Sequence, residues 1–123
     1  MRSRKEDLPL AIETPGGTMR VLADQGGMAV ARYYFTAETD FTPLLAALPG
    51  GHCSVPHWGY VISGRVDMEY ADGVREVYEA GQVYYQPPGH SGATASAGTE
   101  IVEFSPEPDY TKLIDAFKSM MRG

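Results

Sequence analysis

One stretch decides the fold, and it is Cys53-Ser54-Val55-Pro56-His57-Trp58-Gly59-Tyr60-Val61-Ile62-Ser63-Gly64. It is rich in β-branched and aromatic residues, which favour a strand, and it ends at a Ser-Gly turn signal. The surrounding segment from Gly51 to Ser91 contains all three histidines, the only cysteine and the only tryptophan. We therefore expect a β-sheet here, with a pocket beside it.

Short strand patterns continue on both sides of this stretch, each bounded by glycine, proline or aspartate turns. The sequence predicts strands at about residues 8–13, 18–23, 28–36, 53–63, 65–70, 74–79, 82–86, 92–96 and 99–105. Strands this short, with turns this regular, are typical of sandwiches and barrels and not of parallel βαβ units. The predicted fold is all-β, an antiparallel double-sheet sandwich or barrel.

Two segments depart from the strand pattern. Residues 42–48 begin with a good N-cap, Thr42, followed by Pro43, and predict one or two helical turns, with a strand as the alternative. Asp109 can cap a second helix that runs to about Met121. Its apolar stripe either covers an outer sheet face or forms a dimer contact, and it consists of Leu113, Ile114, Phe117, Met120 and Met121.

Length and composition set the class of protein. The 123 residues make one domain, which we divide into an N-terminal strand arm (1–27), a β-barrel core (28–105) and a C-terminal helix (109–122). A net charge of −6 argues against nucleic acid or an anionic membrane as a partner. No apolar signal segment follows Met1, and one cysteine cannot form an internal disulfide, so we expect a cytoplasmic protein.

The cysteine and the histidines are candidate metal ligands. Cys53 and His57 share a strand face, but four residues of straight strand span roughly 13 Å, too far for one ion. A bend, which Gly50-Gly51 and Pro56 would permit, brings them together. His90 follows a Pro-Pro-Gly turn from which it can reach the same pocket. We therefore predict a metal site of Cys53, His57 and His90, with His52 as an alternative ligand.

The predicted ion is a divalent transition metal, because imidazole and thiolate are natural ligands for such ions. Zinc is the first choice, with nickel or iron as alternatives. A simpler interpretation also stands for each residue: Cys53 as a small buried apolar residue, His57 as a hydrogen-bonded pocket wall and His52 as an exposed loop residue.

Parity along the strands predicts further pocket residues. Val61 shares the face of Cys53 and His57, and Val83 and Tyr85 share a face that we expect to turn toward the cavity. Glu103 lies between Val102 and Phe104 in the sequence. If those two point into the core, Glu103 points to solvent, which is the predicted orientation.

The sequence resembles the cupin superfamily, whose first motif is Gly-x5-His-x-His-x3–4-Glu-x6-Gly. Gly64 closes this motif here, and the glutamate position is then occupied by His57. The second histidine position falls on Cys53, or on His52 with the longer spacing, and the first falls on Gly51 or Gly50. One usual ligand is therefore replaced by glycine.

The second cupin motif is Gly-x5-Pro-x-Gly-x2-His-x3-Asn. Gly81, Pro87 and Gly89 fit it in register, whereas its histidine position is Gly92 and its asparagine position is Ser96; His90 stands two positions early. A closer likeness is to small single-domain cupin proteins of uncharacterised function. These share with this chain a cysteine and the segments Pro-His-Trp-Gly-Tyr-Val, Tyr-Ala-Asp-Gly, Glu-Ala-Gly, Pro-Pro-Gly-His and Val-Glu-Phe-Ser-Pro.

The resemblance implies a cupin (jelly-roll) barrel, a homodimer, and Cys53, His57 and His90 as the replacement ligand set. It equally permits a pocket without metal. Two function classes follow: a metal-dependent enzyme acting on a small organic molecule, or a small-molecule binding or sensing module without catalytic activity. A purely structural role ranks last, because fold alone does not select a function.

Overall fold

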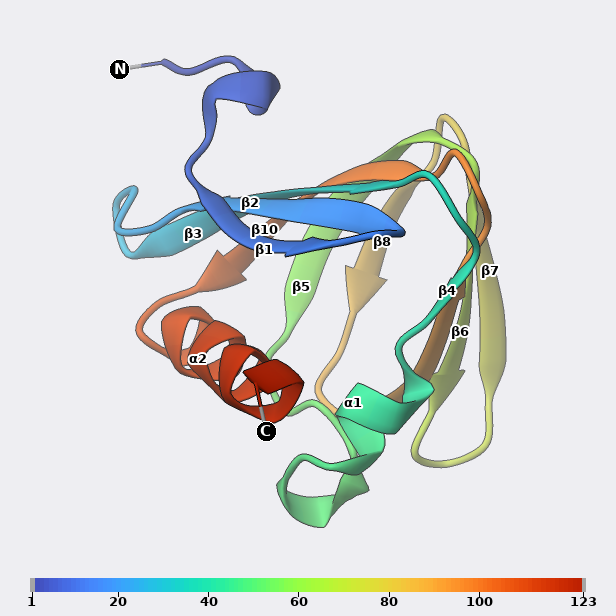
Figure 1. Ribbon diagram of the computed structural model, residues 1–123. Helices are drawn as coiled ribbons and strands as arrows, with labels where there is room; N and C mark the ends of the chain where they lie inside the picture. The colour runs from blue at the N-terminus through green and yellow to red at the C-terminus, as the bar shows by residue number, and fades with distance from the viewer. Residues whose placement is uncertain (1, 123) are drawn as a thin grey trace.

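The structure is a computed structural model that describes residues 2–122. Within these residues ten strands form two antiparallel sheets that face each other (Figure 1). The six-stranded sheet contains, in spatial order, β1 (Leu10–Thr14), β2 (Gly17–Leu22), β3 (Met28–Phe35), β10 (Glu100–Pro106), β5 (His57–Ser63) and β8 (Val83–Gln86). The four-stranded sheet contains β4 (Thr39–Asp40), β9 (His90–Ala95), β6 (Arg65–Tyr70) and β7 (Arg75–Glu79). The predicted antiparallel two-sheet fold is confirmed.

The helical turn predicted after β4 is confirmed as α1 (Thr42–Ala46), which is followed by a 3-10 turn, η2 (Pro49–Gly51). Thr42 is the first helical residue and Phe41 is the N-cap, whereas Thr42 was predicted as the cap; the carboxylate of Asp40 accepts the backbone N–H of Thr42 at 2.9 Å. A further 3-10 turn, η1, spans Lys5–Asp7. Among the described residues, no helix has both the length and the apolar character needed to cross a membrane.

The C-terminal helix, α2 (Asp109–Arg122), covers a different surface from the outer sheet face that its apolar stripe suggested. Leu113 and Ile114 are buried in a core cluster with Ala29 and Ala31 of β3. Those alanines alternate along β3 onto the same face as Tyr33, which lines the internal pocket. The helix therefore closes the open end of the sandwich, below β3 and β10 in Figure 1, on the inner face of the six-stranded sheet.

Two strand boundaries differ from the prediction in a way that matters for the site. β5 begins at His57 and not at Cys53, because Pro56 has no N–H to continue the ladder. β9 begins at His90, two residues earlier than predicted. Cys53 lies outside β5 and forms an isolated antiparallel bridge with His90.

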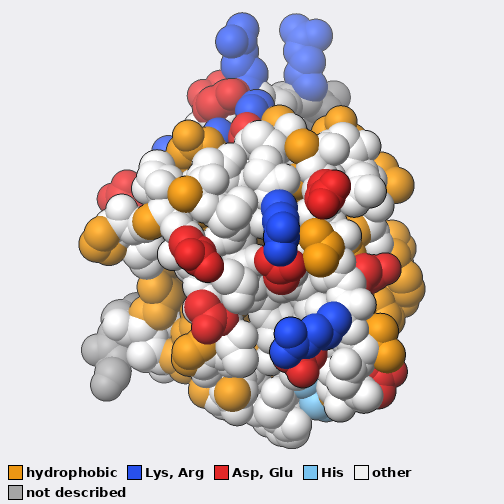
Figure 2. Space-filling model, turned by 90° about the vertical axis from the view of Figure 1, so that its right-hand side faces the viewer, with side chains coloured by type: hydrophobic (Ala, Val, Ile, Leu, Met, Phe, Trp, Pro, Cys, Tyr) orange, Lys and Arg blue, Asp and Glu red, His pale blue; other side chains and the backbone are white. Residues whose placement is uncertain are grey.

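The four-stranded sheet has an apolar inner face and a charged outer face. Val66 and Met68 of β6 are buried, and Ala95 of β9 packs with them. Figure 2 shows the outer side, where acidic and basic side chains are interspersed. One ion pair on this surface joins Arg65 and Asp67 at 3.0 Å. The interior of the molecule lies between this sheet and β3, β10, β5 and β8.

Candidate metal centre

The structure brings the three predicted ligands together. The backbone N–H of Cys53 donates to the carbonyl of His90 at 2.9 Å, and the N–H of Gly89 donates to the carbonyl of Cys53 at 2.8 Å. The chain bends at Val55-Pro56, so the Sγ of Cys53 lies 3.8 Å from the Nε2 of His57. One donor atom from each of Cys53, His57 and His90 lies within 4.8 Å of the others, and all three residues are buried.

His57 is held in position by the neighbouring strand. β5 and β10 pair with Trp58 opposite Phe104, which places His57 beside Ser105. Its Nδ1 lies 2.6 Å from the Ser105 hydroxyl and 3.6 Å from a carboxylate oxygen of Glu103. The carboxylate favours the proton on Nδ1, so Nε2 carries the lone pair and points toward Cys53.

His90 is oriented by its own turn. Its Nδ1 lies 3.1 Å from the carbonyl oxygen of Pro87. A carbonyl oxygen only accepts hydrogen bonds, so Nδ1 is the protonated nitrogen and Nε2 carries the lone pair. The imidazole rings of His57 and His90 lie 5.0 Å apart between centroids. Both imidazoles are thus neutral. Each is held by a hydrogen bond at Nδ1, and its Nε2 carries the lone pair that can bind a cation.

The geometry suits a tetrahedral transition-metal ion. Bonds of ~2.0 Å to nitrogen and ~2.3 Å to sulfur place ligand atoms roughly 3.3–3.6 Å apart. The Cys53–His57 separation of 3.8 Å is close to this, and all the donor atoms lie within 4.8 Å of one another, so binding an ion requires shifts of at most the order of an ångström. His52 lies outside the converging group, and its buried Nδ1 has no hydrogen-bond partner.

Burial keeps all three groups uncharged when no ion is bound. It raises the pKa of the Cys53 thiol to about 11 and lowers the pKa of His57 to about 3. Burial, with the neighbouring His57, lowers the pKa of His90 to about 4. At neutral pH the imidazoles are therefore ready to bind a cation, whereas the thiol must first lose its proton.

Glu103 belongs to the candidate site, although the sequence predicted otherwise. It was predicted to face solvent, but it is buried, and its neighbour Phe104 is exposed instead. The hydroxyl of Tyr84 donates to one carboxylate oxygen at 2.7 Å, and that of Tyr33 lies 3.3 Å from the other. Burial raises the pKa of Glu103. The apolar Ile101, which shares its face, was the one available sign that this side of β10 points inward.

Gly59 explains how Tyr84 reaches that carboxylate. The two residues face each other across β5 and β8. A Cβ at Gly59 would lie 2.3 Å from the ring of Tyr84, so only glycine leaves room for the phenol to cross the inner face of the sheet.

The predicted wall residues are placed differently. Val83 and Tyr85 are 80% and 50% exposed, on the outer face of the sheet, because β8 directs Tyr84 and Gln86 inward. Val61 faces inward as predicted, but it is fully buried in a core cluster with Val66 and Met68 and does not line the pocket. Side chains do alternate along β8, but the inner face carries Tyr84 and Gln86 and not Val83 and Tyr85.

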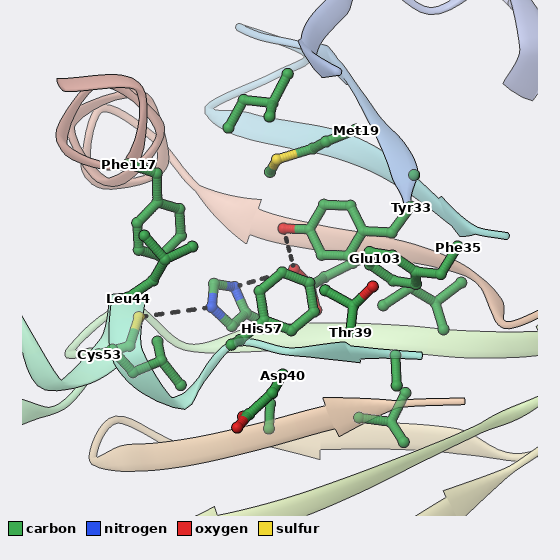
Figure 3. A pocket seen from close by; sticks show the side chains of 18 of the residues that line it. Met19, Tyr33, Phe35, Thr39, Asp40, Leu44, Cys53, His57, Glu103 and Phe117 are labelled. Atoms are coloured by element: carbon green, nitrogen blue, oxygen red, sulfur yellow. Dashed lines mark hydrogen bonds and ion pairs between the residues drawn. The ribbon is translucent and has the colours of Figure 1, made fainter. Parts of the chain in front are cut away.

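The pocket itself is a cavity of about 200 Å³ beside the three donors. Figure 3 shows Cys53, His57 and Glu103 in a row along one side of it. Most of its remaining surface is apolar, from both sheets and both helices, and includes Met19, Phe35, Phe41, Leu44, Met68, Ile101, Phe117 and Met121. The arrangement places three candidate ligand atoms at one side of a largely apolar chamber.

Comparisons with known proteins agree with the architecture. No protein-family model matches the sequence, and no curated protein matches it either. An RmlC-like cupin from Shewanella frigidimarina matches the structure with a TM-score of 0.59 and 19% identity, covering 88% of this chain and 93% of that one. KdgF from a Halomonas species matches with a TM-score of 0.59 and 16% identity, covering 86% and 93%.

Oxalate decarboxylase from Bacillus subtilis also matches, with a TM-score of 0.58 and 16% identity. The match covers 82% of this chain but only 28% of that longer protein. At these identities the similarity concerns the fold. Together with the two facing antiparallel sheets, it shows that this protein has a cupin-type fold.

Proposed function

We propose that the protein binds one divalent transition-metal ion through Cys53, His57 and His90, and a small organic ligand in the adjoining cavity. Zinc is the expected ion, with nickel and iron as alternatives. One observation carries the proposal: three buried donor atoms converge within 4.8 Å. The second nitrogen of each imidazole is engaged elsewhere, which is the usual way in which metal-binding histidines are oriented.

The number of ligands supports a site that also takes a ligand from outside. Purely structural zinc sites use four protein ligands, whereas sites that act on substrates use three and leave one position open. Here Cys53, His57 and His90 line the apolar cavity, so an ion held by them would polarise an oxygen of a molecule bound there. Glu103 and Ser105 hold the His57 ring behind the site.

A metal-free binding module is the second candidate, and one observation favours it. Without an ion all three groups are uncharged, and the Cys53 thiol lies 3.8 Å from the carbonyl oxygen of Val55 as a weak donor. Such an uncharged, mainly apolar pocket is suited to bind a small molecule without a metal ion.

Elemental analysis of untagged protein tests the choice. We expect close to one zinc, nickel or iron per chain, and a higher Tm when zinc is added to metal-free protein. Cys53→Ser, His57→Ala and His90→Ala should each weaken zinc binding on the order of 100-fold or more, beyond the 10–100-fold typical of supporting residues. His52→Ala is the matched control and should keep full affinity, since His52 lies outside the group.

Absence of stoichiometric metal, with no change in Tm on adding zinc, nickel or iron, would reject the metal centre. Retention of metal by His57→Ala would show that this imidazole is a pocket wall and not a ligand.

A further inference from the structure

The outer face of the six-stranded sheet carries most of the exposed apolar side chains of the molecule. Ten large hydrophobic side chains among the described residues are exposed, and six of them lie on this face. They are Tyr34 on β3, Phe104 on β10, Trp58 and Tyr60 on β5, and Val83 and Tyr85 on β8. An antiparallel sheet commonly buries one face and turns polar side chains to water on the other. The four-stranded sheet does so, whereas this face has the character of a surface that another molecule covers.

Strand pairing joins most of these side chains into one continuous surface. Phe104 lies opposite Trp58, which in turn lies opposite Tyr85, so three aromatic side chains form a row across β10, β5 and β8. The next row consists of Val102, Tyr60 and Val83. We call these two rows the aromatic patch. Its centre lies on β5, and its rim on one side is the edge strand β8.

The charges around the aromatic patch suit a second copy of this chain. Among the outward positions of β3, β10, β5 and β8, Glu100 is the only acidic residue. Its carboxylate is already paired with Lys5 at 2.5 Å and with Arg32 at 2.7 Å. The net charge of −6 therefore resides on other surfaces, and two copies can bring these faces together without opposing like charges. A strongly basic partner, in contrast, has no free acidic group to bind on this face.

The area of the aromatic patch matches what a stable dimer needs. Its four aromatic side chains are 44–50% exposed. At roughly 150–250 Å² per aromatic side chain, these fractions leave about 300–450 Å² accessible on each chain, to which Val83 adds. A standard interface buries about 800 Å² per partner, of which about 60% is apolar. The aromatic patch thus has about the size of the apolar centre of such an interface.

We propose that a second copy of this chain covers the aromatic patch, in a symmetric homodimer whose six-stranded sheets pack outer face against outer face. A two-fold axis close to Trp58 and Tyr60 places each aromatic patch on its counterpart, so one surface supplies both halves of the interface. Tryptophan and tyrosine are the side chains that most often contribute binding energy at the centre of an interface, whereas a rim residue such as Val83 contributes little. The three candidate metal ligands line the cavity on the inner side of the sheet, so the dimer does not depend on the proposed metal centre.

The only tryptophan of the chain lies in the aromatic patch, so its fluorescence reports on this surface directly. Sedimentation of untagged full-length protein should give the mass of two chains. Trp58 emission should lie at shorter wavelength, and be less quenched by acrylamide, in the dimer than in the single chain, because the partner excludes water from the ring. If dilution separates the dimer, mass and emission should change over the same range of concentration.

Tyr60→Glu separates the chains at the centre of the interface. Tyr60 is 45% exposed, so its replacement leaves the interior of each chain intact, whereas two buried carboxylates would lack partners in the dimer. The Kd of the dimer should rise at least about 30-fold, the loss expected at an interface hot spot. The matched control is Val77→Glu on the outer face of β7, where Val77 is 44% exposed; it should keep the wild-type mass and emission. Phe104→Ala, which adds no charge, should raise the Kd about tenfold, and circular dichroism checks that each variant is folded.

Wild-type protein that sediments as one chain at every concentration would overturn the inference. So would a dimer whose mass and Trp58 emission are the same in Tyr60→Glu, because its interface would then lie elsewhere, for example along the edge strand β1. Loss of the dimer in Val77→Glu as well would show an unspecific effect of added charge and would equally contradict the assignment to the aromatic patch.

Discussion

Both sheets alternate their side chains between an inner and an outer face, but the six-stranded sheet also buries a group of polar side chains on its inner face. In the four-stranded sheet, β6 buries Val66 and Met68 and turns charged residues such as Asp67 outward. In the six-stranded sheet, β5 and β10 bury polar side chains, and the aromatic residues lie outside. The buried polar residues are His57, Glu103 and Ser105, and the exposed aromatic ones include Trp58, Tyr60 and Phe104.

This difference places the candidate site on the inner face of the six-stranded sheet. Burying a polar group costs free energy unless it is hydrogen-bonded, and the inner polar residues bond chiefly to one another. Ser105 contacts His57, and Tyr84 donates to Glu103. On the outer face Trp58 stacks on Tyr85 with ring centroids 5.2 Å apart, which shields part of both rings. A polar inner face therefore marks the candidate site.

The largest effect is expected from Glu103→Ala in metal-free protein. Removal of the carboxylate leaves the Tyr84 hydroxyl without its partner and opens a cavity, so the free energy of unfolding should fall by about 3 kcal/mol. Asp67→Ala, on the charged outer face of the other sheet, should change it by less than about 0.5 kcal/mol. Urea unfolding measures both. Similar losses of unfolding free energy for the two variants would show that the buried polar face of β10 contributes no more to stability than the charged outer face of β6.

The next effect is a pH dependence of zinc affinity. Above pH 6 both imidazoles are neutral, because their pKa values are lowered to about 3 and about 4, and below pH 8 the Cys53 thiol is protonated, because its pKa is about 11. Zinc takes the thiolate and releases one proton, so the apparent affinity should rise about tenfold per pH unit over this range.

Calorimetry in two buffers with different ionisation enthalpies counts that proton. His52→Ala should release the same number, since His52 is outside the group. A flat pH profile would show that Cys53 does not bind as a thiolate.

The smallest effect is expected on the outer face of β8. Val83→Ala removes a side chain that is 80% exposed, so it should change the free energy of unfolding by less than about 0.5 kcal/mol and leave zinc affinity unaltered. Val66→Ala, the same substitution on the buried face of β6, should cost about 2 kcal/mol. Thermal unfolding and zinc titration of both variants provide the measurement. A change in the zinc affinity of Val83→Ala would show that Val83 contributes to the metal site despite its position on the outer face.

Much of the fold could be predicted from local pattern. Short alternating strands separated by glycine and proline turns predict two antiparallel sheets, and the glycine and proline framework resembles the cupin motifs. Gly64 illustrates the reason, since its φ of +78° and its contact with Thr99 permit only glycine at that turn. The helix after β4 could also be predicted from local sequence, because Pro43 suits a first helical turn.

The candidate site was predicted in part. Cys53, His57 and His90 could be grouped from residue type and a possible bend at Pro56, and the structure places their donor atoms together. Glu103 could not be found in this way. Its orientation depends on which face of β10 meets the other sheet, and the apolar Val102 and Phe104 on either side suggested the opposite face.

The sequence by itself determined the alternation of side chains along each strand, because successive residues of a strand point to opposite faces whatever lies beyond them. Only the tertiary structure decided which face is the inside. The pairing of Cys53 with His90 and the position of α2 across the open end fix that choice. Both contacts are made by residues outside the strand, so no local pattern within β10 contains the information that makes Glu103 a buried residue.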